Sequence, residues 1–340
     1  MSAAQRWAGR LSLPVIAAPM TSVSTPELVI AACRSGVIGA FPTHNAPSPQ
    51  VLDDWLRRMR DALGPTAPPV APNLVVHPSN TRRNADLECL LRHEVELVIT
   101  SVGSPKPVIG PLHDVGAQVY VDVASLAHAS RAVDAGADGL VLLTAGAGGQ
   151  TGWANPFAFV RAVREWFDGP LVLAGGISDG HAILAAQALG VDLVYLGTRF
   201  IATHESGAEN GYRRAVVGAS LDDVRLSDRV GGIPASLLAE WLDAQRAHGT
   251  DAEGFRQDRL LANRTAWSAG HSVSGVHEIS SVAAVVASLA ADYATARTTL
   301  PVVADGQPAR IAAAALPRSD SSSHLLGVDI TDTPPTPFSV

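Results

Sequence analysis

Residues 144–157, TAGAGGQTGWANPF, combine four glycines with one long neutral polar side chain, Gln150. The stretch follows an apolar run, GLVLL, so the glycines expose bare backbone directly after an expected buried strand. The Gln150 amide can donate and accept hydrogen bonds but takes up no proton near neutral pH. Such a loop suits a flat ligand that approaches the backbone closely, with Gln150 orienting a polar group of the substrate.

Two more glycine turns follow apolar runs further along the chain. LVLAGGISDG places Gly175 and Gly176 ahead of an expected helix, and YLGTRF places Gly197 and Thr198 at the start of a short one. Backbone N–H groups at helix starts are suited to binding a phosphate. Because these turns follow the seventh and eighth expected strands, where barrel enzymes commonly hold a phosphate, they predict a phosphate site.

The other expected strand ends carry few acids or bases. They offer Asn73, Thr100 and Ser101, with Asp122 within the fifth strand. We find no metal-ligand spacing of His, Cys, Asp or Glu, no Ser-His-Asp set and no lysine placed for a Schiff base. Chemistry in such a site is expected from a bound cofactor, and a phosphate anchor with glycine turns and amide side chains suits FMN.

Three histidines are candidates for a catalytic role. His44 in FPTHNAP and His77 in VVHPSN follow the second and third expected strands, and His271 follows WSAG. Each is also compatible with a loop histidine that only holds backbone groups. Trp153 and Phe157 are expected either to form an apolar wall over a bound ring or to pack against the following helix.

The elements that must position these residues repeat as strand and helix. Continuous apolar runs, as expected of strands buried on both faces, begin at residues 14, 37, 70, 95, 117, 138, 170 and 192. Ser and Thr caps and Pro at first turns mark helices between them, as in STPELV and SPQVL. Ser125 is expected to cap a further helix, and Ser178 or Asp179 another. Eight units in one uninterrupted series favour a (β/α)8 TIM barrel over a doubly wound open sheet.

The alternation ends near residue 203. We expect an FMN-binding TIM barrel from residues 1–203 and 271–315 and a helical insertion or lid at 204–270, after the eighth strand. Its polar surface and tryptophan-bearing apolar ends also make the insertion a candidate homodimer contact. Residues 316–340 are rich in Ser, Thr and Pro, which predicts a loose C-terminal tail.

Composition excludes several functional classes. A net charge of −7 and a pI near 5.8 argue against nucleic-acid binding. No apolar run reaches the roughly eighteen residues of a membrane span, and LSLPVIAAPM is short and broken by prolines, which predicts a strand rather than a signal peptide. Cys33 and Cys89 fit buried thiols in a reducing cytoplasm.

The order of six motifs resembles that of the nitronate monooxygenases, formerly called 2-nitropropane dioxygenases. The wider group includes FMN-dependent enoyl reductases and NAD(P)H:quinone reductases. The resemblance spans about residues 10–300 and rests on PVIAAPM, PNLVV, TAGAGGQTG, LVLAGGISDG, YLGTRFIATHES and AWSAGH. It implies an FMN-bearing TIM barrel with a small helical domain after strand eight.

The resemblance also assigns residues to the flavin. It implies a ring contact at residues 18–20, a ring or ribityl contact at Asn73, close backbone at Gly149 and a phosphate site at the two glycine turns. A segment that returns to the flavin pocket is implied at Trp267, Ser268 and Gly270. The flavin-binding residues that we expect are Ala18, Pro19, Met20, Asn73, Thr100, Asp122, Gly149, Gly175, Gly176, Gly197, Thr198, Trp267 and Ser268.

Two positions depart from the family pattern. Many members carry a histidine after the paired glycines, where this chain has Gln150, and a basic residue is frequent in part of the family at the position of Asp122. Because Gln150 takes up no proton, the departure disfavours a deprotonating mechanism but remains compatible with a substrate that arrives as an anion. Gln150, His44 and His271 are the candidate catalytic residues.

We therefore expect a flavin-dependent monooxygenase that oxidises a small nitronate with molecular oxygen. The alternative is an NAD(P)H-dependent ene or quinone reductase, or a tailoring oxidase that acts on an enone or an acyl thioester. A third hypothesis is a flavin-binding protein without turnover. No second G-x-G-x-x-G fingerprint follows a strand, which is mild evidence against a dedicated nicotinamide site.

Overall fold

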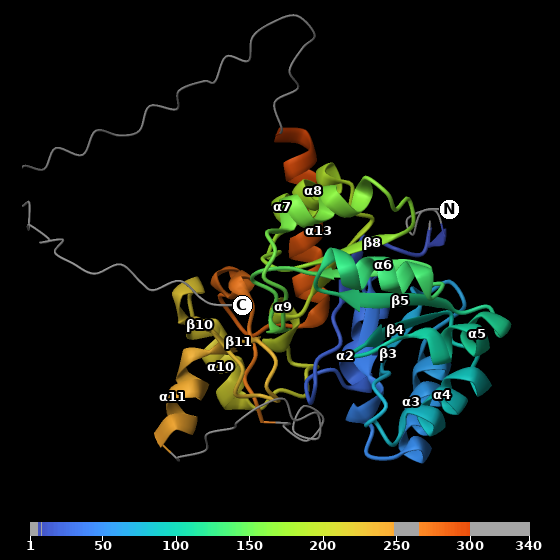
Figure 1. Cartoon of the computed structure of the whole chain (residues 1–340). Helices are drawn as coiled ribbons and strands as arrows, with labels where there is room; N and C mark the ends of the chain where they lie inside the picture. Colours follow the sequence, from blue (N-terminus) through green and yellow to red (C-terminus); the bar gives the residue numbers. More distant parts are fainter. Residues whose placement is uncertain (1–5, 8, 248–264, 300–340) are drawn as a thin grey trace, which may run out of the picture. The chain divides into compact units, whose positions relative to one another are not determined.

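The computed structural model describes residues 6–7, 9–247 and 265–299 (Figure 1). These residues belong to a single compact unit. The predicted tail at 316–340 and the last part of the predicted barrel range, 300–315, lie outside the described residues.

A closed barrel of eight parallel strands is the centre of this unit. All eight apolar runs form strands, which confirms the predicted TIM barrel. Strand β9 pairs with β1, with Tyr195 beside Ile16, so the sheet closes and the open-sheet alternative is wrong. The strands are β1 (Val15–Ala17), β2 (Ile38–Pro42), β3 (Val70–Val75), β4 (Leu97–Ser101), β5 (Gln118–Val123), β6 (Gly139–Leu143), β8 (Leu171–Ala174) and β9 (Leu193–Leu196).

Helices surround the barrel, and Figure 1 shows α3, α4 and α5 outside β3 and β4. The helices that follow the strands are α2 (Pro26–Arg34), α3 (Pro49–Ala62), α4 (Arg83–Arg92), α5 (Lys106–Asp114), α6 (Leu126–Asp134), α7 (Pro156–Arg164), α8 (Gly180–Leu189) and α9 (Thr198–Ile201). Three predicted caps are confirmed, because the side chains of Thr25, Ser48 and Ser125 accept backbone N–H bonds. At α8, Asp179 rather than Ser178 is the capping residue. The last helix, α13 (Val282–Thr299), packs against α8 and α2.

The strand residues alternate between two cores. One set, which includes Ile99, Tyr120, Val141 and Val172, fills the inside of the barrel. Their neighbours along each strand pack outward against the helices, as period-two alternation requires. Because the interior is filled by these side chains, a ligand site is expected at the carboxyl ends of the strands.

The segment after β9 contains strands as well as the predicted helices. It comprises α10 (Asn210–Gly218), η2 (Leu221–Asp223), β10 (Val224–Ser227), β11 (Ala235–Leu238) and α11 (Ala239–Ala247). We expected a helical insertion, and the two strands are a correction. The ASLL run forms a strand because it pairs antiparallel with β10 on one side and with β7 (Gly149–Gln150) on the other.

Short 3₁₀ helices complete the described elements, at η1 (Thr43–Asn45) and η3 (His271–Gly275). Within the described residues, none of the helices has the length and apolar character that crossing a lipid bilayer requires.

Candidate functional site

A cavity of about 250 Å³ opens at the carboxyl ends of the barrel strands. Residues at the ends of β2, β3, β4, β5, β6, β8 and β9 line it, together with the segment after β1, the β6–β7 loop, β11 and the segment after residue 265. The predicted site residues that line this cavity are Ala18, Pro19, Met20, His44, Asn73, Asp122, Gly149, Gln150, Gly175, Gly176, Gly197, Thr198 and Ser268.

The two glycines after β8 are required for different reasons, one by packing against the protein and the other by the open space beside it. Gly175 has φ +129°, and a Cβ there would lie 2.4 Å from Thr144 Oγ1, so packing excludes a side chain. Gly176 has φ +71°, yet a Cβ would meet nothing within 4 Å in the described chain. Open space beside a left-handed glycine in the cavity wall is where a ligand group can approach the backbone.

The second glycine turn lies beside the first and is anchored to the returning chain. Thr198, at the start of α9, accepts a hydrogen bond from the Gly270 N–H at 3.0 Å through Oγ1. A Cβ at Gly197 would lie 3.3 Å from Met20 Sδ, so the turn packs closely on the end of β1. The Thr198 hydroxyl therefore positions the protein backbone, and the turn faces the cavity through Gly197 and the start of the helix.

The other loop glycines allow the chain to approach itself. A Cβ at Gly152 would lie 2.2 Å from the Leu143 carbonyl oxygen, and one at Gly148 would lie 2.8 Å from the Gly270 nitrogen. Gly149 is more open, with its nearest neighbour 3.8 Å away at Ser268. The sequence predicted that these glycines let a ligand approach the backbone. Among the three, Gly149 fits this prediction best.

Gln150 is held over the cavity by backbone pairing. It lies in β7 opposite Ala235 of β11, so its backbone position does not depend on its side chain. Its side-chain Nε2 is buried and has no hydrogen-bond partner within the described chain. A buried amide donor without a partner is costly, which indicates a site for an acceptor from a ligand.

Polar side chains at the strand ends form the floor of the cavity. Asn73 Oδ1 accepts from the Ser101 hydroxyl at 3.1 Å, and its Nδ2 donates to the Ile99 carbonyl at 3.4 Å. Both Asn73 and Ser101 line the cavity. Thr100, which we predicted as a cofactor contact, is absent from the lining, because its neighbours Ile99 and Ser101 occupy the inward positions of β4. Strand alternation directs Thr100 away from the cavity.

Asp122 is the acidic group of this floor. It lines the cavity, but its Oδ1 is buried and lacks a hydrogen-bond partner within the described residues. Burial raises the pKa of Asp122 to about 7. The Tyr195 hydroxyl is likewise buried without a described partner, and burial, with the charge of Asp122, raises the pKa of Tyr195 well above its ordinary value.

Asp122→Asn should stabilise the cofactor-free protein more at pH 8 than at pH 5. The unfolded chain loses the Asp122 proton near the ordinary pKa of 3.8, whereas the folded chain keeps it up to about 7. The free energy of unfolding of the wild type therefore falls as pH rises through this window. We expect the advantage of Asp122→Asn to grow by about 2 kcal/mol from pH 5 to 8 in urea unfolding. An advantage that does not change with pH would contradict the assignment.

The three candidate histidines occupy different environments. His44 lines the cavity, and its Nε2 lies 3.2 Å from Thr21 Oγ1. His77 is absent from the lining, and its Nδ1 lies 3.2 Å from Ser79 Oγ in its own loop. His271 is exposed and also absent from the lining, while its backbone N–H donates to the Gly146 carbonyl at 2.9 Å. The structure therefore brings His44, but neither His77 nor His271, to the cavity.

The returning segment contributes one of its two predicted contacts. Ser268 lines the cavity, whereas Trp267 is absent from the lining and stacks on Tyr212 at 5.6 Å between ring centroids. Trp267 Nε1 donates to Glu209 at 3.0 Å. Trp267 thus supports Tyr212, which does line the cavity, and the hydroxyl of Tyr212 donates to the Ser268 carbonyl.

Trp153 and Phe157 do not form the apolar wall that was one of our two hypotheses. They are 85% and 60% exposed and are absent from the cavity lining. From the insertion, Val230 and Leu237 contribute apolar side chains to the cavity, beside those of the barrel. Sequence reasoning missed these residues, as well as Tyr195. The alternation of LVYLG would have placed Tyr195 on the inner face with Leu193.

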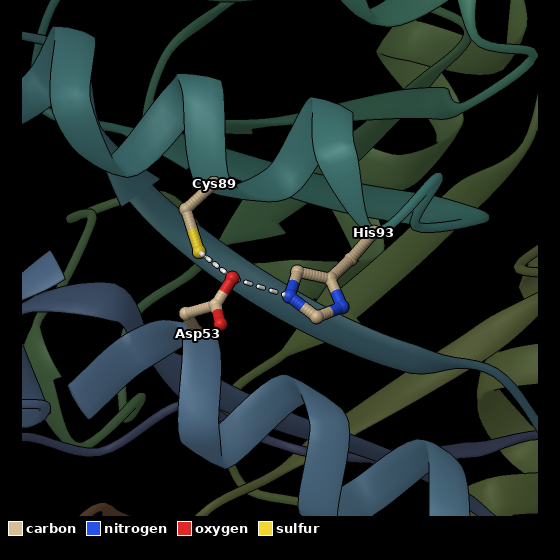
Figure 2. Close-up of side chains that lie close together, drawn as sticks. All are labelled: Asp53, Cys89 and His93. Carbon is tan, nitrogen blue, oxygen red and sulfur yellow. Dashed lines mark hydrogen bonds and ion pairs between the residues drawn. The ribbon is translucent and has the colours of Figure 1, made fainter. Parts of the chain in front are cut away.

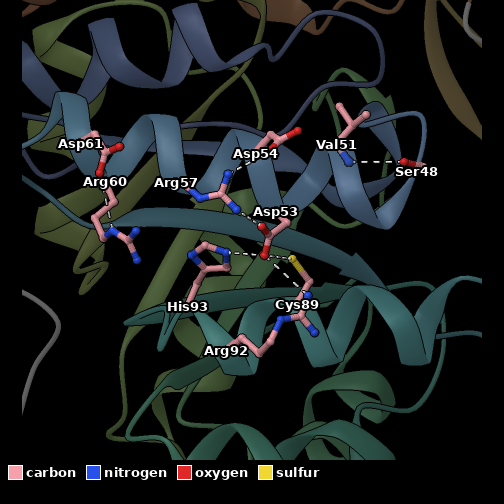
Figure 3. Close-up of polar contacts among 10 residues, drawn as sticks. All are labelled: Ser48, Val51, Asp53, Asp54, Arg57, Arg60, Asp61, Cys89, Arg92 and His93. Atoms are coloured by element: carbon pink, nitrogen blue, oxygen red, sulfur yellow. Dashed lines mark hydrogen bonds and ion pairs between the residues drawn. The ribbon is translucent and has the colours of Figure 1, made fainter.

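A polar cluster lies between α3 and α4 (Figure 2). Ligand-type atoms of Asp53, Cys89 and His93 lie within 4.8 Å of one another, a grouping that sequence spacing did not predict. His93 Nε2 lies 2.8 Å from Asp53 Oδ1, and Figure 3 shows Arg57 and Arg92 directed at the same carboxylate. Burial raises the pKa of the Cys89 thiol to about 11. We interpret the cluster as an ion-pair network that joins the two helices.

Comparison with known proteins identifies the family. The family model described as nitronate monooxygenase matches residues 77–292. A nitronate monooxygenase of Paraburkholderia phytofirmans is 28% identical over 270 residues, which cover 66% of this chain and 73% of the relative. The (3aS,4S,5R,7aS)-5-hydroxy-7a-methyl-1-oxo-octahydro-1H-indene-4-carboxyl-CoA dehydrogenase of Mycobacterium tuberculosis is 26% identical over 245 residues, 71% of this chain and 67% of that protein.

A solved structure agrees with this result. The nitroalkane oxidase from Streptomyces ansochromogenes matches with a TM-score of 0.76 and 27% identity, covering 86% of this chain and 99% of that chain. The family match spans the carboxyl ends of five barrel strands, from β4 to β9, and the insertion, which contribute much of the cavity lining. The chain therefore belongs to the nitronate monooxygenase family of oxidoreductases.

Proposed function

We propose that this chain is an FMN-dependent monooxygenase that oxidises small nitronates with molecular oxygen. The family match supports this proposal, as do the nitronate monooxygenase of P. phytofirmans and the nitroalkane oxidase of S. ansochromogenes. The observation on which the choice of substrate rests is the Gln150 Nε2 group, a buried donor at the cavity with no hydrogen-bond partner in the described residues.

The residues of the cavity fit FMN. Gly176 leaves open space beside a backbone that a phosphate can approach, and Gly197 opens the neighbouring turn. Asn73 and Asp122 offer polar atoms to a ring edge, and Gly149 allows the ring to approach the chain closely. Ala18, Pro19, Met20, Thr198 and Ser268 complete the proposed contacts. When bound, FMN would supply the two-electron chemistry that these side chains lack.

The protein's own contribution to nitronate binding is neutral and polar. No lysine or arginine occurs among the cavity-lining residues that the structure describes, so the substrate charge meets hydrogen-bond donors and dipoles instead. Gln150 Nε2–H would donate to a nitronate oxygen, and His44 on the η1 side would border the same space. Val230 and Leu237 would exclude water from the reacting carbon. Because Gln150 is no base, a substrate that is already an anion suits the site best.

One observation favours a second candidate function. The relative from M. tuberculosis is named as the dehydrogenase of a carboxyl-CoA thioester, so an oxidase of acyl thioesters is the alternative that we retain. A second form of this alternative is a reductase that takes its electrons from NAD(P)H, as the reductases of the wider group do. Mixing with a nitronate and with NAD(P)H separates the monooxygenase from the reductase.

Anaerobic stopped-flow mixing tests the proposal. The FMN-loaded protein should lose its flavin absorbance rapidly on mixing with ethylnitronate and regain it on admission of oxygen. Neutral nitroethane, NADH and NADPH should act much more slowly. The proposal is wrong if ethylnitronate leaves the flavin oxidised, and rapid bleaching by NADPH alone would instead identify a reductase.

A further inference from the structure

Asp122 occupies the inner face of β5 at the floor of the cavity. Tyr120, two residues earlier, belongs to the barrel interior, whereas Val121 and Val123 pack outward against the helices. The Asp122 side chain therefore lies directly above the apolar filling of the barrel and below the cavity that it lines. The proposed function does not by itself explain why an acid occupies this position.

The surroundings of Asp122 do not provide a partner for a negative charge. Facing groups on β3 and β4 are the neutral Asn73 and Ser101, and β6 contributes Leu143. The titratable groups at the same cavity are Tyr195 on β9, Tyr212 on α10 and His44 on η1. Burial is the cause of the raised Asp122 pKa of about 7, with no charged neighbour contributing among the described residues. Below neutral pH the group is therefore a carboxylic acid, which has a proton to donate.

The position of β5 in the barrel places this acid away from the phosphate turns. The strand order β5-β6-β8-β9 puts the Asp122 strand two places from β8 and three from β9, whose ends carry Gly176 and Gly197. An elongated ligand anchored by its phosphate at those turns would reach across the cavity toward the other strands. The ring, rather than the phosphate, would then be the part nearest Asp122.

We propose that Asp122 acts as a neutral carboxylic acid that donates a hydrogen bond to an acceptor atom of the bound flavin ring, and that its ionisation at alkaline pH weakens flavin binding and disfavours flavin reduction. The inference rests on the proposed function only in requiring that FMN occupy the cavity. The physical basis is that an ionised Asp122 has no proton to donate and repels the negative charge that a flavin gains on reduction. A permanently neutral amide at this position would remove the pH dependence and keep a donor.

Titration of the cofactor-free protein with FMN tests the binding part. The FMN phosphate itself ionises near pH 6, and this changes the affinity of every variant in the same way. After correction for this shared effect, we expect the wild type to bind FMN about tenfold more weakly at pH 8.5 than at pH 6. That shared effect is measured with Asp122→Asn, which should bind at pH 8.5 at least as tightly as the wild type does at pH 6. Asp134→Asn makes the same chemical change on the exposed face of α6 and should follow the wild type.

Redox titration of the bound flavin gives the second readout. The ratio of affinities for reduced and oxidised FMN should differ between wild type and Asp122→Asn by about tenfold above pH 8 and by less than about twofold below pH 6. Circular dichroism of each variant confirms folding. Asp122→Leu provides a second neutral variant that lacks the donor, and it should bind FMN weakly at every pH.

Parallel pH profiles in wild type and Asp122→Asn would overturn the inference while leaving FMN binding intact. Failure of the wild type to bind FMN at any pH would instead overturn the proposed function.

Discussion

Gly176→Asp should abolish FMN binding while the barrel still folds. Gly176 lies at the cavity with φ +71°, and a Cβ there meets no described atom within 4 Å, so the new side chain enters the space that we assign to the phosphate. A carboxylate there repels the phosphate and occupies its place. We expect FMN affinity to fall by more than about a hundredfold, measured by quenching of FMN fluorescence.

Gly116→Asp is a matched control for this variant. Gly116 has φ +79° and also leaves a Cβ without neighbours within 4 Å, but it precedes β5 at the opposite end of the barrel from the cavity. Both substitutions therefore impose similar backbone strain. Gly116→Asp should lose stability to a similar degree and keep wild-type FMN affinity. Equal loss of FMN in the two variants would show that strain, rather than the phosphate site, explains the result.

Gln150→Ala should lower turnover about ten- to a hundredfold while FMN remains bound. One hydrogen bond from a buried amide to a developing charge is worth about 1–3 kcal/mol, which corresponds to this range. The backbone pairing of Gln150 with Ala235 survives the substitution, so the loop keeps its course. Steady-state kinetics with ethylnitronate, together with flavin occupancy, provide the measurement.

Two further variants sharpen the test of Gln150. Gln150→His should introduce a group that titrates near neutrality and with it a new limb in the pH–rate profile between pH 5 and 9. Trp153→Ala alters an 85% exposed side chain of the same loop and should leave turnover unchanged. Full activity in Gln150→Ala would mean that its side chain has no chemical role, and His44 would then be the next residue to examine.

The barrel could be predicted because each strand lies in a continuous apolar run and several of the helices start at a capping side chain, as α2, α3 and α6 do. The runs VELVITS and AQVYVDV contain the adjacent strands β4 and β5, and the Ser125 cap was visible from residue type alone. The insertion was harder to predict, because the ASLL strand runs directly into a helix and no turn residue separates the two. It becomes a strand through pairing with Gly149–Gln150, which lies more than 80 residues earlier in the chain.

The parts of the site that consist of glycine turns and strand ends could be predicted from the sequence. Thr100 was misplaced because an error of one residue in strand phase exchanges the inner and outer faces. Trp267 and His271 belong to a segment that reaches the cavity by tertiary contacts, such as Gly270 with Thr198, and no local pattern indicates which of its side chains face inward. The unpaired buried atoms of Asp122 and Tyr195 emerge only when the barrel is closed.

Identification of the bound cofactor tests the central claim most directly. The purified protein should be yellow, and acid precipitation should release one flavin per chain, because the cavity at the carboxyl ends of the strands is expected to hold one non-covalently bound flavin. Chromatography should identify the released flavin as FMN rather than FAD, since the phosphate is expected at the turns of Gly176 and Gly197. A colourless protein that FMN cannot reconstitute would contradict the account.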